Sequence, residues 1–146
     1  MNNRLILIVE DNSDDEALLL RVLKKHNVKN EIVVVRNGAE ALDYLFRNGT
    51  YEDRGDANPA VVLLDLKLPK IDGIEVLKRV RDDERTKRVP VVILTSSDKQ
   101  EDKIRSYDLG CNSYVRKPLG FDRFTEAVAQ LGLYWLILNE PPLESG

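Results

Sequence analysis

The segment Val61-Val62-Leu63-Leu64-Asp65 is an apolar run that ends in one carboxylate, and Leu66-Lys67-Leu68-Pro69 follows at once. Near the start of the chain, residues 5–9 form a second such run, which ends in Glu10-Asp11. Both runs are almost continuously apolar, which is typical of strands covered on both faces in a parallel sheet. Two neighbouring strands of this kind would bring three carboxylates to one edge of the sheet.

Five apolar runs of this character occur along the chain, with segments of helical periodicity between them. The runs are residues 5–9, 32–35, 61–64, 91–94 and 113–115. Helices are expected from Ser13, with Ser13 and Glu16 as a capping box, over 38–48, after Asp72-Gly73, over 98–109 and from about Phe121. Five alternations of strand and helix predict an α/β doubly wound sheet.

Composition limits the class of protein. The 146 residues suit a single domain, and 42% of them are hydrophobic, which is enough for a core. The net charge of −3 and the absence of a basic stretch argue against direct nucleic-acid binding. Cys111 is the single cysteine, which fits a reducing compartment. No signal-peptide pattern or membrane-length apolar run occurs, so we expect a cytoplasmic protein with no membrane association.

The unusual polar residues gather at the predicted carboxyl ends of the strands. Glu10 and Asp11 follow the first run, Asp65 the third, Thr95 the fourth and Lys117 the fifth. Ligands of doubly wound sheets bind beyond these ends. Clustered carboxylates need a cation, and ligands that are all oxygen suit Mg²⁺. The sequence therefore predicts a magnesium site there.

A carboxylate beside Mg²⁺ can act as a nucleophile toward phosphorus and form an aspartyl phosphate. Phosphoryl transfer depends mainly on positioning and on neutralising charge. Asp65 is the candidate nucleophile, and Glu10 and Asp11 would hold the metal. Lys117 could neutralise one phosphate oxygen, and the hydroxyl of Thr95 could donate a hydrogen bond to another.

The order of these motifs resembles the receiver domain of two-component response regulators, the CheY-like family, over about residues 4–131. The resemblance implies a flavodoxin-like parallel sheet of five strands in the order 2-1-3-4-5, with five helices. The interval from Asp11 to Asp65 is 54 positions, longer than usual in the family, and the polar stretch at 50–59 accounts for it. The motifs that carry the resemblance are Glu10-Asp11, Asp65 in Leu-Asp-Leu-Lys-Leu-Pro with Asp72-Gly73 after it, Thr95-Ser96 and Lys117-Pro118.

The resemblance also implies a role for each matching residue. Asp65 would be the phosphoacceptor, with Mg²⁺ held by Asp11, by Asp65 and by the backbone carbonyl of Lys67. Glu10 would act through a metal-bound water. Further implied roles are a switch pair formed by Thr95 and Tyr114, a phosphoryl contact from Lys117, a cis peptide at Lys117-Pro118 and a position bordering the attacking water at Ser97.

Ordinary structural roles stand beside these functional ones. Asp65 could cap a helix or a turn, and Glu10-Asp11 could cap the first helix. Thr95 could be a turn residue at the end of a strand. Tyr114 could be a core aromatic, and Lys67 a solvated surface cation.

The last predicted helix continues past the point where one core would need it. Residues 131–138 are apolar all round, whereas a helix against one core needs a single apolar stripe. Tyr134, Trp135 and Leu138 are therefore candidate interface residues for a homodimer or another partner, unless they pack back onto their own domain. We expect a receiver domain over 1–138, a short tail over 139–146 and no output domain.

The main hypothesis is a single-domain response regulator that accepts a phosphoryl group from a sensor histidine kinase and switches protein–protein interactions. The loop at 50–59 and the Tyr-Trp-Leu ending resemble regulators of bacterial phytochrome-type kinases. Such a protein is no enzyme beyond its own phosphorylation and dephosphorylation. Alternatives are a relay that passes phosphate to a second histidine domain, a receiver that works without phosphorylation, and an aspartyl phosphatase. The phosphatase is disfavoured because Lys67 stands where a general acid would be needed.

Overall fold

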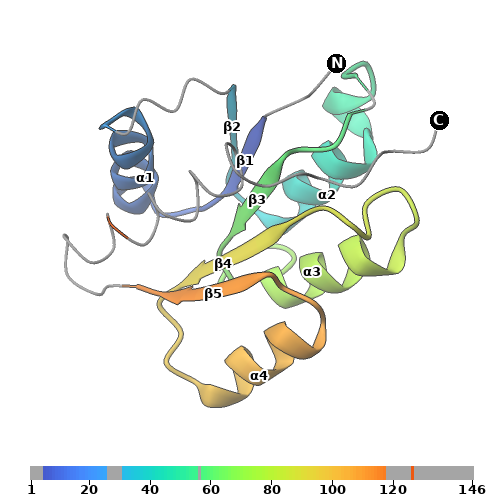
Figure 1. Ribbon diagram of the computed structural model, residues 1–146. Helices are drawn as coiled ribbons and strands as arrows, with labels where there is room; N and C mark the ends of the chain where they lie inside the picture. The colour runs from blue at the N-terminus through green and yellow to red at the C-terminus, as the bar shows by residue number, and fades with distance from the viewer. Residues whose placement is uncertain (1–4, 26–30, 56, 118–125, 127–146) are drawn as a thin grey trace.

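A computed structural model describes residues 5–25, 31–55, 57–117 and 126 of the chain, and all structural statements concern these residues. It contains one parallel sheet in the order β2-β1-β3-β4-β5 (Figure 1), as predicted. The observed strands begin or end within one residue of the predicted runs. They are β1 (Ile6–Val9), β2 (Ile32–Val35), β3 (Val61–Leu64), β4 (Val91–Thr95) and β5 (Ser113–Arg116).

The register of the sheet sets which residues meet at its carboxyl edge. Val9, the last residue of β1, pairs with Val35 of β2 on one side and with Leu64 of β3 on the other. Thr95, the last residue of β4, pairs with Arg116 of β5. The polar residues that follow β1 and β3 are therefore neighbours, and those that follow β5 lie at the same edge beyond β4, although all are far apart in the sequence.

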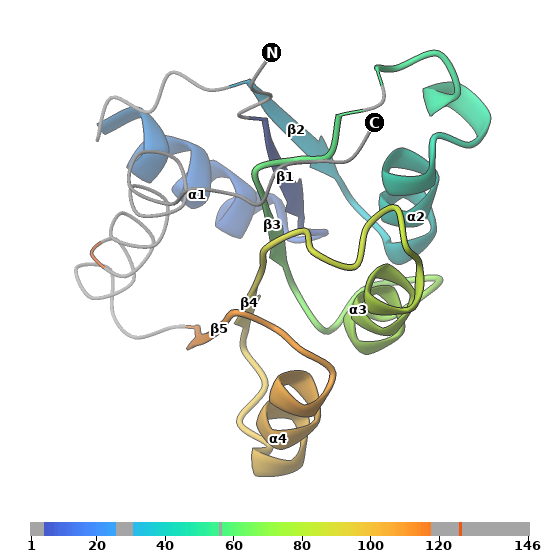
Figure 2. The same cartoon turned by 45° about the vertical axis from the view of Figure 1, so that its right-hand side comes forward.

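Helices cover both faces of the sheet. Figure 2 shows α1 (Ser13–Lys25) on one side and α2 (Gly38–Phe46) and α3 (Gly73–Asp82) on the other. Two buried apolar clusters correspond to these faces: one joins β1, β3 and β4 to α1, and the larger one joins the sheet to α2 and α3. The fifth predicted helix lies outside the described residues, apart from Glu126, which is helical.

The start of α1 differs from the prediction. The side chain of Asn12, not Ser13, caps the helix: its Oδ1 accepts from the backbone N–H groups of Asp14 and Asp15, each at 3.0 Å. The carboxylate of Glu16 is paired with Arg36 at 2.9 Å instead of closing a capping box. The prediction of a capping box was wrong because asparagine one position earlier satisfies the free N–H groups.

The helices after β2 and β3 begin at glycines that lie against the connection between β3 and α3. A Cβ on Gly38 would lie 1.8 Å from the carbonyl oxygen of Ile71, and one on Gly73 would lie 2.2 Å from the carbonyl oxygen of Asp65. Glycine is needed at both positions because the backbones approach too closely for a side chain. The connection that carries Asp65 is thus held between two helix starts.

The polar stretch at 50–59 folds around one guanidinium group. After the short helix η1 (Gly49–Tyr51), Arg54 donates to the carbonyls of Tyr44 and Leu45 at 2.6 and 3.2 Å, and to those of Gly55 and Ala57 at 2.9 and 3.0 Å. The same group lies 4.3 Å from the centre of the Tyr44 ring. The surface loop predicted from the sequence is therefore an ordered structure joined to the end of α2.

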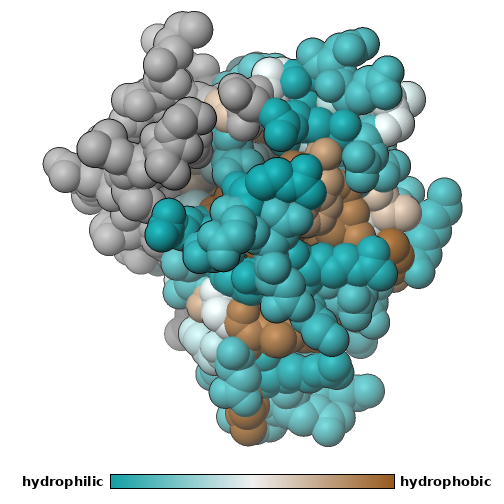
Figure 3. All heavy atoms as spheres, turned by 90° about the vertical axis from the view of Figure 1, so that its right-hand side faces the viewer, coloured by the Kyte–Doolittle hydropathy of each residue, from teal (hydrophilic) through white to brown (hydrophobic). Residues whose placement is uncertain are grey.

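The helix α4 (Gln100–Asp108) is held to the rest of the protein by few side chains. Ser106 is its one buried residue, and its Ile104 and Tyr107 side chains are 53% and 48% exposed. Figure 3 shows the face that carries α2, α3 and α4 as mostly hydrophilic, with hydrophobic patches at its centre and toward its lower end. A helix with so few buried contacts can shift at small cost in free energy.

Candidate functional site

The polar residues at the carboxyl edge of the sheet form one cluster of carboxylates. Glu10 and Asp65 are buried, whereas Asp11 is exposed at the mouth of the cluster. One oxygen from each of the three lies within 4.8 Å of the others. The structure thus brings together the three acids that the sequence predicted.

Lys117 lies among these acids. Its Nζ donates to Oε1 of Glu10 at 2.7 Å and to Oδ2 of Asp15 at 2.8 Å, and it lies 3.5 Å from Oδ2 of Asp65. The Lys117 side chain is 6% exposed. A buried ammonium group is stable here because carboxylates surround it.

Burial controls the ionisation of Glu10. Burial is the largest cause that raises the pKa of Glu10; the hydrogen bond and charge of Lys117 lower it and the nearby Asp65 raises it, so that the pKa lies at about 7. Burial alone would lower the pKa of Lys117, but its hydrogen bonds to Asp15 and Glu10 outweigh this and raise it. Lys117 therefore stays charged, because the carboxylates that accept its hydrogen bonds favour the ammonium form.

The donor set of this cluster fits Mg²⁺. Glu10, Asp11 and Asp65 offer oxygen atoms alone, and Asp11 opens the cluster to solvent, as a cation that keeps several waters requires. A divalent cation would also offset the excess of negative charge over the one ammonium group. These three residues could hold the ion without rearrangement of the sheet.

The backbone around Asp65 is fixed on both sides. The Asp65 N–H donates to the carbonyl of Val9 at 3.1 Å, and Gly73 donates to the carbonyl of Leu66 at 2.8 Å. The N–H of Lys67 lies 3.3 Å from Oδ1 of Asp65. The side chain of Lys67 is exposed, so its ammonium group lies outside the carboxylate cluster. These bonds fix the backbone that carries the Asp65 carboxylate.

Thr95 connects the site to α4. Its side chain is fully buried, and its Oγ1 accepts from the Ser97 N–H at 3.2 Å. The hydroxyl of Ser97 in turn donates to Oδ2 of Asp102, in the first turn of α4, at 2.6 Å. A change in the position of the Thr95 hydroxyl would therefore alter the hydrogen bond that joins Ser97 to α4.

Tyr114 on β5 lies beside this connection. Its hydroxyl oxygen is buried and has no hydrogen-bond partner among the described residues. Its ring centre lies 6.5 Å from that of Tyr107 on α4, and burial raises its pKa. A buried hydroxyl without a partner is costly, so this side chain would gain from a second position.

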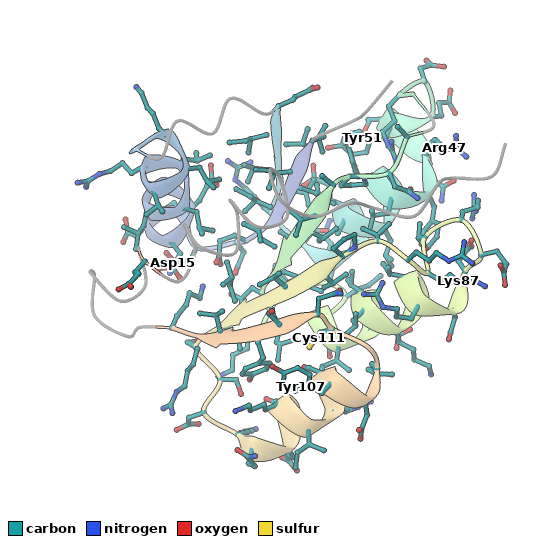
Figure 4. The ribbon with its side chains drawn as sticks, in the orientation of Figure 1. Asp15, Arg47, Tyr51, Lys87, Tyr107 and Cys111 are labelled. Carbon is teal, nitrogen blue, oxygen red and sulfur yellow. The ribbon has the colours of Figure 1, made fainter. Side chains whose placement is uncertain are left out.

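Sequence reasoning missed Asp15. Its contact with Lys117 joins residues that are 102 positions apart, and no local pattern in the sequence signalled it. Figure 4 shows Asp15 at the end of α1 that faces the carboxyl edge of the sheet. The predicted roles of Pro118, Tyr134, Trp135 and Leu138 concern positions outside the described residues.

Comparison with known proteins identifies the class to which this fold and site belong. Residues 6–129 match the family described as the response regulator receiver domain. The chain therefore belongs to the response regulator receiver domain family, as the motif resemblance predicted. Within the described residues, no helix has the length and apolar character that crossing a membrane would require.

Particular relatives place the chain more narrowly. The response regulator Rcp1 of Synechocystis is 38% identical over 133 residues, which cover 91% of this chain and 89% of Rcp1. The phosphorylated cyanobacterial phytochrome response regulator RcpA has a TM-score of 0.89 at 37% identity, covering 97% of this chain and 100% of RcpA. The bacteriophytochrome response regulator AtBRR has a TM-score of 0.77 at 51% identity, covering 96% and 100% of the two chains. The similarity therefore extends over nearly the full length of these three response regulators.

A solved form of Rcp1 bears on the metal. The crystal structure of its Mn²⁺-bound form has a TM-score of 0.88 at 36% identity and covers 96% of this chain and 99% of Rcp1. Rcp1 thus takes a divalent cation, and the cluster of Glu10, Asp11 and Asp65 offers oxygen ligands of the kind that such a cation needs.

Proposed function

We propose that this protein accepts a phosphoryl group on Asp65 from a histidine kinase, in a reaction that depends on Mg²⁺, and thereby switches its interactions with other proteins. The observation that carries the proposal is the grouping of three carboxylates with the buried ammonium of Lys117 at one edge of the sheet. The similarity to RcpA, a relative whose crystal structure is that of a phosphorylated protein, supports it.

The proposed transfer needs little covalent chemistry from the protein. An Oδ of Asp65 forms a bond to phosphorus while the N–P bond of a phosphohistidine breaks, and the electron pair stays on the imidazole nitrogen of the donor. Lys117 and the hydroxyl of Thr95 would neutralise and orient the phosphoryl oxygens. Bound Mg²⁺ would supply charge neutralisation, with Asp11, Asp65 and the carbonyl of Lys67 as ligands and Glu10 acting through a water.

The proposed switch runs from Thr95 to α4. Donation by the Thr95 hydroxyl to a phosphoryl oxygen would move it away from Ser97, whose own hydroxyl holds Asp102. Tyr114, whose buried hydroxyl has no hydrogen-bond partner within the part of the chain that the structure describes, would then change position. Phosphorylation would in this way shift an existing equilibrium at the surface formed by α4 and β5.

The kinase partner proposed is of the phytochrome type, because RcpA is a phytochrome response regulator and AtBRR is a bacteriophytochrome response regulator. Tyr134, Trp135 and Leu138 would contribute to a homodimer that phosphorylation strengthens. A relay role, in which phosphate passes on to a second histidine domain, is the alternative within this class. The phosphatase alternative lacks support because the exposed side chain two positions after Asp65 is Lys67.

The test is intact-protein mass spectrometry after incubation with acetyl phosphate and Mg²⁺, with Asp65→Asn as the control. We expect one phosphoryl adduct that requires Mg²⁺ and is absent from the variant. Beryllofluoride, a phosphoryl mimic, tests the site when the adduct hydrolyses quickly. Failure of both phosphorylation and beryllofluoride binding would refute the proposal.

Partner and oligomer are tested separately. Sedimentation with and without beryllofluoride measures the dimer, and equal sedimentation would refute its dependence on phosphorylation. Transfer assays that combine the protein with phytochrome-type kinases and with histidine domains distinguish a terminal regulator from a relay.

A further inference from the structure

The ammonium of Lys117 has a partner on α1 in addition to the acids of the metal cluster. Asp15, in the first turn of that helix, accepts from Nζ at 2.8 Å, whereas Asp65 lies 3.5 Å from the same atom. Asp15 is labelled in Figure 4, at the end of α1 nearest the carboxyl edge of the sheet. The shortest contacts of the lysine are therefore not with the proposed phosphoacceptor.

The hydrogens of the lysine are all committed in this arrangement. An ammonium group has three of them to donate. Glu10 takes one at 2.7 Å, and Glu10 is itself fixed by the Asn12 N–H, which lies 3.3 Å from its other oxygen. Asp15 takes a second one, which leaves a long contact to Asp65. Asp15 thus draws the ammonium away from the position where a phosphoryl group would be attached.

Exposure distinguishes Asp15 from the other two acids. Its side chain is 35% exposed, against 2% for Glu10 and 9% for Asp65. If the ammonium leaves, water can solvate the Asp15 carboxylate, whereas the two buried acids would be left unpaired at high cost. Release from Asp15 is therefore the least costly way for Lys117 to turn toward a new anion.

We infer that Asp15 is a positioning residue that holds Lys117 in the unphosphorylated protein and competes with the phosphoryl group for it. The inference rests on the proposed function and concerns the regulation of that same site. A phosphoryl anion on Asp65 gains a short contact with Lys117 when the ammonium leaves Asp15. The pair lowers the affinity of the site for the anion and favours the unphosphorylated state.

The test is the affinity for beryllofluoride in the presence of Mg²⁺, measured by a titration in which fluorine NMR detects the bound anion. In Asp15→Asn the competing charge is lost with little change in shape. We expect this variant to bind beryllofluoride about threefold to tenfold more tightly, the range of one partly exposed ion pair. Asp15→Glu keeps a carboxylate and should return the affinity toward that of the wild type.

Asp14→Asn is the matched control, because Asp14 is the exposed neighbour of Asp15 and its loss changes the net charge equally. Exposed charges are screened when the Debye length falls to about 3 Å at 1 M salt. At high salt the small effect of Asp14→Asn should vanish, and that of Asp15→Asn should persist. Thermal unfolding of each variant checks that the fold is retained.

The outcomes distinguish failure of the inference from failure of the proposed function. Tighter binding by Asp15→Asn alone supports the inference. Equal affinity in Asp15→Asn and Asp14→Asn, or weaker binding by Asp15→Asn, overturns it while the proposed function stands. Failure of the wild-type protein to bind beryllofluoride overturns the proposed function and the inference with it.

Discussion

Gly73→Ala is expected to destabilise the protein and to displace the proposed phosphoacceptor. The added Cβ would lie 2.2 Å from the carbonyl oxygen of Asp65 and 2.7 Å from the Cα of Leu66. Both are backbone atoms that cannot rotate away, and an ordinary contact needs about 3.5 Å, so the connection must move by roughly 1 Å.

The cost of this substitution has three parts. Overpacking costs about 1–3 kcal/mol. The hydrogen bond from the Gly73 N–H to the carbonyl of Leu66, at 2.8 Å, contributes about 1 kcal/mol that is weakened or lost. Alanine restricts the unfolded chain and returns up to about 1 kcal/mol. The expected loss in the free energy of unfolding is therefore about 1–3 kcal/mol.

Urea denaturation measures this loss, as a lower midpoint at an unchanged slope. Gly55→Ala is the matched control, because a Cβ there meets no atom within 4 Å, and its effect should stay within about 0.5 kcal/mol. We also expect weaker binding of Mg²⁺ by Gly73→Ala, since the Asp65 backbone must shift. A Gly73→Ala protein as stable as the wild type would refute the packing argument.

Three further predictions concern Glu10, Arg54 and α4. Without metal, the free energy of unfolding should fall as pH rises from 4.5 to about 7, because folded Glu10 keeps a proton that the unfolded chain has released; at about 1.4 kcal/mol per pH unit the fall is about 3 kcal/mol. Urea unfolding over this pH range measures the fall, with Glu10→Gln as the control. If the free energy of unfolding changed with pH equally in the two proteins, the raised pKa of Glu10 would not be its cause. Arg54→Ala should lower the free energy of unfolding by about 2 kcal/mol through the lost carbonyl and ring contacts, and a change below about 0.5 kcal/mol in urea would show that the loop does not depend on them. Asp102→Ala removes the acceptor of the Ser97 hydroxyl and should speed amide hydrogen exchange in α4 about tenfold with the sheet unchanged, whereas unaltered exchange would mean that other contacts hold the helix.

The sheet and the carboxylate cluster could be predicted from the sequence because their signals are local. Each buried strand is a nearly unbroken apolar run, and the acids stand directly after those runs, where parallel strands end together. The predicted end of α2 at residue 48 was two residues too late, because Arg47 adopts a left-handed conformation with φ of 57° and ends the helix. Glycine and asparagine are the residues that usually indicate a left-handed conformation at a helix end, and arginine is not one of them.

Contacts between distant side chains could not be predicted in the same way. Asp15 and Lys117 are 102 positions apart, and their contact depends on how α1 is rotated on the sheet. The cap at Asn12 rather than Ser13 was also not predicted, because either residue is acceptable at a helix start. The burial of the Tyr114 hydroxyl, which lacks a hydrogen-bond partner among residues 5–25, 31–55, 57–117 and 126, is likewise a result of tertiary packing that no local pattern specifies.

The loop organised by Arg54 lies at the edge of the sheet opposite the proposed phosphoryl site. It leads into the amino end of β3, whereas Asp65 follows the carboxyl end of the same strand (Figure 1). Arg54 binds the end of α2 and so fixes the loop between α2 and β3. Residues inserted in this loop therefore need not change the distances between the carboxylates of the site. Tyr51, labelled in Figure 4, is joined to the same region by its hydroxyl, which donates to Glu40 at 3.0 Å. A reporter peptide inserted between the exposed residues Glu52 and Asp53 would therefore label the protein for signalling assays without disturbing the site around Asp65.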